Sequence, residues 1–262
     1  MEKLKVLDLF SGIGGFSLGL ERTGQFQIVA FCEIDDFCQK VLSKNWQNVP
    51  IFSDIRSITS ISQLGEVDVV CGGFPCQPVS CSGKQLGDQD ERWLWPEFYR
   101  IVLLFRPKFV LVENVVGLLS AQQGRLFGGI LRNLAQAGYN AEWQVLSASQ
   151  FGLPHIRKRM FLVAYPNSER FIQNAIFERN KLKGIETRRT KFGNIYITDI
   201  GKTFIDISNY IREIDGIPIE LDENIESRIH SLGNSIVPYC SEYIGNLIIN
   251  SLKDDNTNYQ NL

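Results

Sequence analysis

A cysteine and a glutamate each follow an apolar run that is typical of a buried strand. Cys76 lies in residues 72–78, which read Gly-Gly-Phe-Pro-Cys-Gln-Pro, after the apolar run 67–71. Glu113 directly follows a second apolar run, 109–112. Two prolines and a glutamine make the segment around the cysteine a poor core sequence and favour a stiff, exposed loop. The pattern predicts a nucleophilic thiol and a proton-transferring carboxyl group in one reaction centre.

The chemistry of a thiol requires positive neighbours or a base. A free thiol has a reference pKa of about 8.5, so a catalytic cysteine must be activated by its surroundings. Arg157 and Arg159 alternate along an extended segment, which places both on one side, where they can point into the same cleft. Three structural alternatives remain open: Cys76 as a small buried residue, Glu113 as a solvated acid, and residues 155–159 as a basic surface turn.

A glycine turn provides a second candidate site. Residues 12–17 read Gly-Ile-Gly-Gly-Phe-Ser, follow a strand-like run and open a helical stretch whose free N–H groups can hold an anion. Ser17 stands where a dinucleotide fingerprint has its third glycine, which weakens an NAD interpretation. Glu33 ends the next strand and is suited to accept both ribose hydroxyls. Asp54 is suited to accept from an adenine amino group. The alternative is a tight turn with incidental surface acids.

The elements that would position these residues alternate between strands and helices. Strand-like runs lie near 5–10, 28–33, 67–71, 108–113 and 160–164. Helical stretches lie near 16–22, 35–44, 95–105, 124–137 and 239–252. This alternation predicts an α/β fold, with a Rossmann-like, mostly parallel sheet and helices on both faces. Ligands of such sheets bind beyond the carboxyl ends of the strands, where the candidate residues fall.

Composition and charge predict one large domain with an insert. The 262 residues are 44% apolar and 21% charged, with a net charge of −2. From 166 to 202 Lys and Arg outnumber acids by eight to four, and from 203 to 228 the balance reverses. We therefore assign 1–165 and 229–253 to the main domain and 166–228 to a subdomain. The polar residues 254–262 are expected to form a disordered tail.

Cysteine usage and the N-terminal sequence bear on cellular location. The six cysteines include no Cys-x-x-Cys pair and there are only two histidines, so no zinc or other metal site is expected. No stretch approaches the roughly 18 apolar residues of a membrane helix, and the N-terminus lacks the features of a signal peptide. We expect a cytoplasmic protein in a reducing compartment, without membrane contact.

Seven motifs in order resemble those of the DNA (cytosine-5) methyltransferase family, and the resemblance covers nearly the whole chain outside 166–228. The matching segments are 8–16 (Asp-Leu-Phe-Ser-Gly-Ile-Gly-Gly-Phe), 32–35 (Cys-Glu-Ile-Asp), 54–55 (Asp-Ile), 73–78 (Gly-Phe-Pro-Cys-Gln-Pro), 113–115 (Glu-Asn-Val), 157–159 (Arg-Lys-Arg) and 233–238 (Gly-Asn-Ser-Ile-Val-Pro). No single motif would suffice, but seven in family order are highly specific.

The resemblance implies a class I methyltransferase fold that binds S-adenosyl-L-methionine. The implied cofactor-binding residues are Phe10, Gly12, Ile13, Gly14, Glu33, Ile34, Asp54, Ile55, Pro75, Asn234 and Ser235. Cys76 would be the nucleophile, Glu113 would hold and protonate cytosine N3, Arg159 would bind O2, and Arg157 would support the flipped base. Residues 166–228 would recognise the target in double-stranded DNA. A monomer is expected, with any cognate restriction endonuclease encoded separately.

Two departures and three competing readings accompany the resemblance. His155 replaces the glutamine usual before the paired arginines, and residues 90–95 depart from the common Arg-Gly pattern. A cytidine deaminase is excluded because its zinc site needs Pro-Cys-x-x-Cys, whereas the next cysteine after Cys76 is Cys81. A tRNA cytosine-5 methyltransferase and a catalytically silent DNA-binding protein remain alternatives. The absence of cysteine from 166–228 favours DNA over tRNA, because the tRNA enzymes usually carry a Cys-Phe-Thr signature there.

Overall fold

The computed structural model describes most of the two segments that carry the predicted main domain. The described residues are 2–75, 93–153, 155–167, 176–177, 186–190, 193–197, 203–205 and 235–259. No helix within these ranges has both the length and the apolar character needed to cross a membrane. Nor do the described side chains include a group of three or more His, Cys, Asp or Glu residues able to hold a metal ion.

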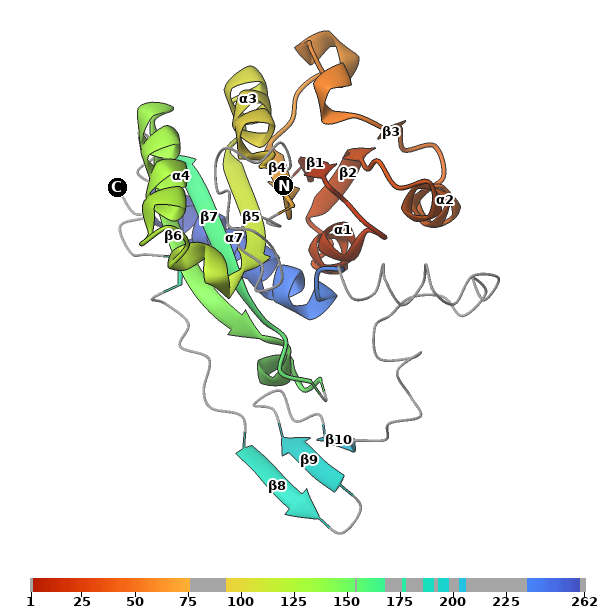
Figure 1. The fold of residues 1–262 in the computed structure, drawn as a ribbon, viewed down its shortest axis with the longest axis vertical. Coiled ribbons are helices and arrows are strands. Elements are labelled where there is room, and N and C mark those ends of the chain that lie inside the picture. Colours follow the sequence, from red (N-terminus) through yellow and green to blue (C-terminus); the bar gives the residue numbers. More distant parts are fainter. Residues whose placement is uncertain are drawn as a thin grey trace.

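A seven-stranded sheet forms the centre of the fold (Figure 1). Its strands are β1 (Leu4–Leu9), β2 (Phe26–Cys32), β3 (Ile51–Phe52), β4 (Val69–Gly72), β5 (Phe109–Val115), β6 (Tyr139–Ser147) and β7 (Lys158–Pro166). Across the sheet they run in the order β3-β2-β1-β4-β5-β7-β6. The first five are parallel, whereas β7 is antiparallel to both β5 and β6. The predicted α/β fold with a mostly parallel sheet is therefore confirmed.

Helices cover both faces of this sheet. They are α1 (Gly15–Arg22), α2 (Asp36–Asn45), α3 (Trp95–Phe105), α4 (Arg125–Gln136) and α7 (Pro238–Tyr259), with 3₁₀ turns η1 (Ile55–Ser57), η2 (Ile61–Gln63), η5 (Val116–Leu119) and η6 (Ala148–Phe151). Figure 1 shows α4 and α7 on opposite faces of β7. Alternate residues of β7 account for this, since Met160 and Leu162 join the α3–α4 side of the core and Phe161 and Val163 join the α7 side.

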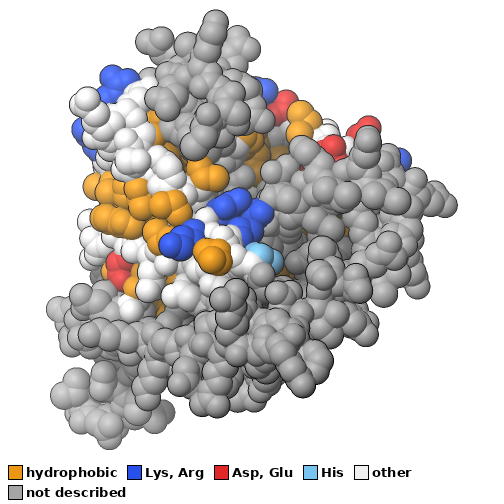
Figure 2. All heavy atoms as spheres, turned by 60° about the horizontal axis from the view of Figure 1, so that its bottom comes forward, with side chains coloured by type: hydrophobic (Ala, Val, Ile, Leu, Met, Phe, Trp, Pro, Cys, Tyr) orange, Lys and Arg blue, Asp and Glu red, His pale blue; other side chains and the backbone are white. Residues whose placement is uncertain are grey.

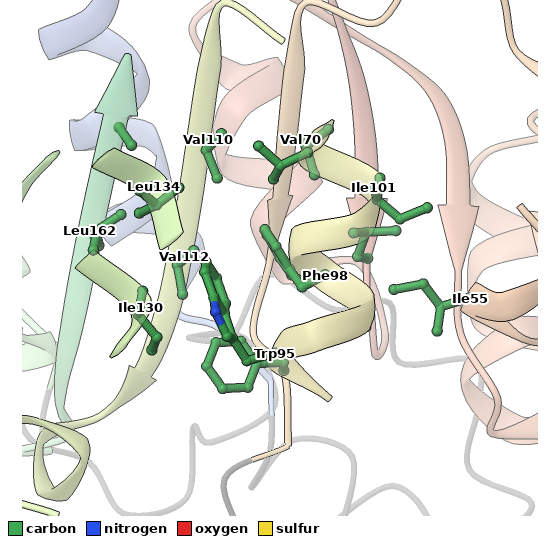
Figure 3. Packing of buried hydrophobic residues seen from close by; sticks show 14 of the residues in the cluster. Ile55, Val70, Trp95, Phe98, Ile101, Val110, Val112, Ile130, Leu134 and Leu162 are labelled. Carbon is green, nitrogen blue, oxygen red and sulfur yellow. The ribbon is translucent and has the colours of Figure 1, made fainter. Parts of the chain in front are cut away.

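The α3–α4 side of the core is built from interlocking side chains of helices and strands (Figure 3). Phe98 and Ile101 of α3 lie against Val70 and Val110, while Ile130 and Leu134 of α4 lie beside Val112 and Leu162. Most of these side chains are almost completely buried. Apolar burial of this kind contributes about 1.5–3 kcal/mol for each large side chain and holds the strand ends in fixed register.

Helices α1 and α7 approach closely because α1 carries a glycine at the contact. A β-carbon at Gly19 would overlap the carbonyl oxygen of Pro238 and the hydroxyl of Ser241. The Ser241 hydroxyl also donates to the Gly15 carbonyl at 3.4 Å. This contact fixes the C-terminal helix against the helix that follows the glycine turn, although 226 residues separate Gly15 and Ser241.

Three further strands fall within the segment assigned to the subdomain. They are β8 (Glu186–Thr190), β9 (Gly193–Ile197) and β10 (Thr203–Ile205), paired antiparallel in the order β10-β9-β8. Two other residues of this segment, Ile176 and Phe177, pack with the α7 side of the main core.

Two elements differ from those expected from the sequence. Helix α7 continues to Tyr259, beyond the end expected near residue 252, and the disorder expected for the tail 254–262 stays a prediction. The segment contains no Gly or Pro to end the helix. Strand β6 was not predicted, because as an edge strand it mixes buried, half-buried and exposed side chains.

Candidate active site

The carboxyl ends of β1, β4 and β5 lie side by side at one edge of the sheet. The last residues paired across these strands are Leu9, Gly72 and Val112. The next residues in the chain are Phe10, Gly73 and Glu113, so these three lie at the same height along the strands. The glycine turn, the Phe-Pro-Cys segment and the glutamate thus share one edge, as the sequence predicts for strand ends.

The glycine turn is held against the end of β2 by the Glu33 carboxylate. The Gly12 N–H donates to Glu33 Oε2 at 2.7 Å, and the Asp35 N–H donates to Oε1 at 2.9 Å. The Ser11 N–H donates to the Cys32 carbonyl at 3.1 Å. Glu33 is therefore fixed beside the turn, with acceptor capacity on each oxygen beyond these bonds.

The turn has an unusual backbone. Phe10 has a φ of +54°, in the left-handed region that side-chain-bearing residues rarely adopt. Gly12 and Gly14 also have positive φ, and Gly14 immediately precedes α1. Ile13 is buried and packs with side chains of α2. A left-handed backbone conformation at a residue other than glycine, as at Phe10, costs about 1–3 kcal/mol, and such residues cluster at functional sites.

Asp8 lies beneath the turn, completely buried at the end of β1. The Ser17 hydroxyl donates to Asp8 Oδ2 at 2.6 Å. Burial raises the pKa of Asp8 to about 7, although the bonds from Ser17 and Cys71 lower it. Ser17, which stands in place of a third glycine, thus has a defined structural partner. The sequence indicated no role for Asp8 beyond its place in the motif.

Two further predicted cofactor residues follow β2 and β3 at the same edge. The Glu33 N–H donates to the Phe52 carbonyl at 2.9 Å, which aligns the ends of these neighbouring strands. Ile34, the next residue, is 80% exposed to solvent. Asp54 follows β3 and caps η1, where Ile55 is buried.

Arg100 braces the segment that carries Asp54 and Ile55. Its guanidinium donates to the carbonyls of Ile55 and Ile58 at 2.8 and 2.7 Å, and to Glu97 at 2.8 Å. Arg100 belongs to α3 on the other side of this loop. The sequence did not indicate this residue, because the contact joins parts of the chain more than 40 residues apart.

Glu113 is buried near the carboxyl end of β5, two residues before the strand ends at Val115, and lies beside positive charges. Arg159 Nε lies 3.1 Å from Glu113 Oε1. Burial raises the pKa of Glu113 to about 7, because desolvation outweighs the opposing effects of Arg159 and Arg157. The structure therefore brings Glu113 and the two predicted arginines together. A carboxyl group with this pKa is partly protonated near neutral pH and is suited to proton transfer.

Two contacts, one at Gly73 and one from Asn114, set the position of Glu113 relative to the Phe-Pro-Cys segment. A β-carbon at Gly73 would lie 2.9 Å from Glu113 Oε2, so a side chain there would displace the carboxyl group. The Asn114 side chain donates to the Phe74 carbonyl at 3.1 Å. The carbonyl two residues before Cys76 is thus bonded to the residue after Glu113.

An aromatic cluster holds both ends of the segment that contains Cys76. Phe74 contacts Trp93 edge-on, with ring centroids 5.3 Å apart, and its centroids lie 5.7 and 6.2 Å from those of Trp95 and Phe98. Phe74 is 2% exposed. This cluster was not predicted, although the aromatic residues at 93, 95 and 98 were a signal for it.

Arg157 links the sheet edge that carries Glu113 to the start of the C-terminal segment. Its guanidinium donates to the Ser235 carbonyl at 2.8 Å. The next residue, Ile236, lies against both α1 and the Gly73 position. Figure 2 shows Lys and Arg side chains gathered on one face of the molecule, beside hydrophobic side chains. Ser235 therefore lies beside Arg157 and, through the next residue, near both the glycine turn and Gly73.

Several predicted site residues fall outside the described ranges. They are Cys76, Asn234 and residues 90–92 of the 90–95 segment, together with the loop after Cys76. Pro75 is the last described residue before the cysteine and is half-buried.

Comparison with known proteins decides the family. A sequence profile of C-5 cytosine-specific DNA methylases matches residues 4–215. The chain belongs to this family. It is 34% identical over 212 residues to the Type II methyltransferase M.HgiBI of Herpetosiphon aurantiacus, covering 74% of this chain and 48% of the relative. It is also 34% identical over 171 residues to the Type II methyltransferase M.Bsp6I of Bacillus sp., covering 64% and 54%.

The family match extends to the three-dimensional fold. The methyltransferase EhMeth of Entamoeba histolytica matches 96% of this chain and 99% of its own, with a TM-score of 0.66 and 20% identity. This likeness concerns the fold alone. The chain spans about half the length of the curated relatives that it matches.

Proposed function

We propose that this family member transfers a methyl group from S-adenosyl-L-methionine to carbon 5 of a cytosine in duplex DNA. The observation that carries this proposal is the buried Glu113 carboxyl group, placed beside Arg159 at the strand edge that also bears the glycine turn. Its raised pKa fits an acid that must donate a proton to a base ring.

The residues at the glycine turn fit the proposed cofactor. Glu33 is fixed by two N–H groups and retains acceptor capacity for ribose hydroxyls. Ile34 presents an exposed apolar surface on which an adenine ring can pack. Asp54 lies at the neighbouring strand end, where it can accept from an amino group. When bound, S-adenosyl-L-methionine supplies an electrophilic methyl group. Phe10, Gly12, Ile13, Gly14, Ile55, Pro75, Asn234 and Ser235 complete the proposed set.

The proposed chemistry divides between Cys76 and Glu113. Carbon 5 of cytosine is too electron-poor to attack an electrophile directly. We assign Cys76 to add its thiolate to carbon 6, while Glu113 gives a proton to N3 and Arg159 binds O2. The ring then becomes nucleophilic at carbon 5. After carbon 5 gains the methyl group, a base takes the carbon 5 proton, the thiolate is eliminated and the N3 proton returns to Glu113, which restores the aromatic ring and the starting state of both side chains.

The proposed substrate must reach a buried carboxyl group, which requires the cytosine to leave the duplex stack. Extrusion of a base costs a few kcal/mol. We assign Arg157 to support the flipped base and residues 166–228 to recognise the surrounding sequence. Residues 1–165 and 229–253 form the proposed catalytic domain. The relatives named Type II methyltransferases support a partner restriction endonuclease, while a monomeric state and a cytoplasmic location stay predictions.

The first test of the proposal is covalent capture. DNA carrying 5-fluorocytosine at the target should form an adduct in the presence of S-adenosyl-L-methionine, because fluorine is not released as a proton would be. Cys76→Ala should form no adduct, whereas Cys240→Ala, a buried cysteine of α7, should retain it. An adduct that persists in Cys76→Ala would remove this residue from its role.

The second test separates the alternatives that the sequence left open. Mixed-sequence DNA and a tRNA pool are incubated with the protein and cofactor, then sequenced after bisulfite treatment. We expect one cytosine to be methylated within a short DNA motif of roughly two to six base pairs, since each base contact contributes about 1–3 kcal/mol of discrimination. Methylated tRNA with unmodified DNA would support the tRNA alternative. No methylation with retained DNA binding would support the silent one.

A further inference from the structure

Glu142 occupies an unusual position on the edge strand β6. It pairs with Val163 of β7, on the face of the sheet that α7 covers. Its neighbour Trp143 points to the opposite face, where it contacts Phe127 of α4 with ring centroids 5.1 Å apart. Glu142 is thus a carboxylate on the apolar face of a sheet, where it requires hydrogen-bond partners.

The partners of Glu142 come from two separate parts of the chain. The Tyr165 hydroxyl donates to Glu142 Oε1 at 2.7 Å. The Ile176 N–H donates to the same oxygen at 3.1 Å, and the Phe177 N–H donates to Oε2 at 3.3 Å. One carboxylate therefore binds two consecutive backbone N–H groups, which no strand or helix satisfies at this point.

Apolar packing accompanies these bonds. Ile176 is 3% exposed and belongs to the core cluster on the α7 side of the sheet, and Phe177 packs against that cluster. Full burial of an isoleucine side chain contributes strongly to such an attachment. The two residues are therefore held both by the carboxylate and by the core.

The attachment shortens the connection into the subdomain. Strand β7 ends at Pro166 and β8 begins at Glu186, so 19 residues (167–185) separate them. With 176–177 held on the core, eight residues (178–185) remain before β8. The probability that a flexible chain brings its ends together falls with its length to the power 3/2. A connection of 8 residues therefore places β8 near the core roughly three- to fourfold more often than one of 19 residues.

We propose that Glu142 is a positioning residue that anchors the entry to the target-recognition subdomain. This inference rests on the proposed function of residues 166–228. Leu146 of the same strand pairs with Arg159, four residues along the ladder from the Glu142–Val163 pair, which is about 13 Å at the usual strand rise. The anchor and the proposed base-binding arginine therefore lie on one rigid pair of strands. DNA read by the subdomain is held in register with the site at Glu113.

Hydrogen exchange of the Ile176 and Phe177 amides tests the anchor without any activity. In Glu142→Ala we expect both amides to exchange roughly tenfold faster. In the wild type their bonds to the carboxylate must open before exchange, and the variant lacks these bonds. Asn140→Ala is the matched control, an exposed side chain on the same strand and face, and should leave both rates unchanged. Tyr165→Phe keeps the carboxylate and both amide bonds and should change them little. Unchanged exchange in Glu142→Ala would overturn the anchor.

Steady-state methylation tests the functional part of the proposal. Glu142→Ala should raise the KM for DNA roughly three- to fourfold, which is the factor by which loop closure over the longer connection is less favourable. Glu142→Gln keeps one oxygen acceptor and should raise it less. The kcat at saturating DNA and the calorimetric affinity for S-adenosyl-L-methionine should stay at wild-type values. Faster exchange with an unchanged KM for DNA would refute the positioning role. A wild-type protein that methylates nothing would refute the proposed function instead, while the exchange result would still decide the anchor.

Discussion

Asp8→Asn should stabilise the protein above neutral pH, although it removes a charge from a hydrogen-bonded carboxylate. Asp8 is completely buried below the glycine turn, with the Ser17 hydroxyl donating to Oδ2. Burial raises its pKa from 3.8 to about 7. In the unfolded chain the same group ionises in water near its ordinary value. The folded state therefore holds this proton over a range of pH in which the unfolded state has lost it.

The sign and size of the effect follow from linkage. Because the folded pKa of Asp8 is the higher one, its contribution to stability is fully present below about pH 4 and is lost as pH rises to about 7. A shift of about three pKa units corresponds to about 4 kcal/mol. About 3 kcal/mol of this falls between pH 5 and pH 8. A neutral asparagine of the same shape has no ionised form to desolvate and avoids this loss.

Urea unfolding at pH 5 and pH 8 measures the difference directly. The free energy of unfolding of Asp8→Asn minus that of the wild type should become more favourable by up to about 3 kcal/mol between the two pH values. Glu113 also has a raised pKa, but it is present in both proteins and cancels. Asp68→Asn is the control, because Asp68 accepts from the Lys5 N–H and pairs with Lys108, each at 2.9 Å. It should give no stabilisation at pH 8.

One outcome would refute the reasoning about Asp8. If Asp8→Asn lowered stability equally at pH 5 and pH 8, the carboxyl group would be ionised in the folded state at both. The bonds from Ser17 and Cys71 would then outweigh burial, contrary to the order of effects on its pKa.

Three further predictions concern the cofactor site and the helix contact. Glu33→Ala should weaken S-adenosyl-L-methionine binding by about 1.5–3 kcal/mol in calorimetry, while Glu113→Gln leaves that affinity nearly intact and depresses turnover; equal losses would contradict the two assignments. Gly19→Ala should destabilise the protein by about 1–3 kcal/mol, because α7 must shift to make room for the β-carbon. Gly128→Ala in α4 is the control: its β-carbon meets open space, and it should stabilise the protein by about 0.5–1 kcal/mol. Arg100→Ala frees the Ile55 and Ile58 carbonyls and should weaken cofactor binding by about 1–2 kcal/mol, and an unchanged affinity would show that this brace does not hold the site.

Local patterns predicted the parts of the site that depend on strand ends and alternation. Apolar runs with Asp8, Glu33 and Glu113 at or near their ends indicated parallel strands, and parallel strands bring their carboxyl ends to one edge. Alternation placed Arg157 and Arg159 on one side, and both lower the pKa of Glu113. These relations hold over a few residues, so a single sequence contains them.

Contacts between distant parts of the chain were beyond such patterns. The bond from Asn114 to the Phe74 carbonyl spans 40 residues, and the anchor from Glu142 to Ile176 spans 34. Strand β6 itself was missed because an edge strand lacks a uniform apolar face. A glutamate on a mixed strand has no sequence signal that separates it from a solvated acid, since its role depends on which N–H groups the fold brings to it.

Residues 235–236 of the C-terminal segment connect the glycine turn with the site at Glu113 through contacts between distant parts of the chain. Gly15 allows the Ile236 carbonyl to lie against the helix that follows the glycine turn, and the Ile236 side chain reaches the Gly73 position beside Glu113. The Ser235 carbonyl accepts from Arg157, whose charge lowers the pKa of Glu113. A displacement of residues 235–236 would therefore disturb the turn, the arginine and the carboxyl group together. The proposed cofactor and base sites are thus coupled through backbone that lies more than 200 residues from the turn in sequence, and the packing of α7 on α1 together with the Arg157 bond keeps that backbone in place.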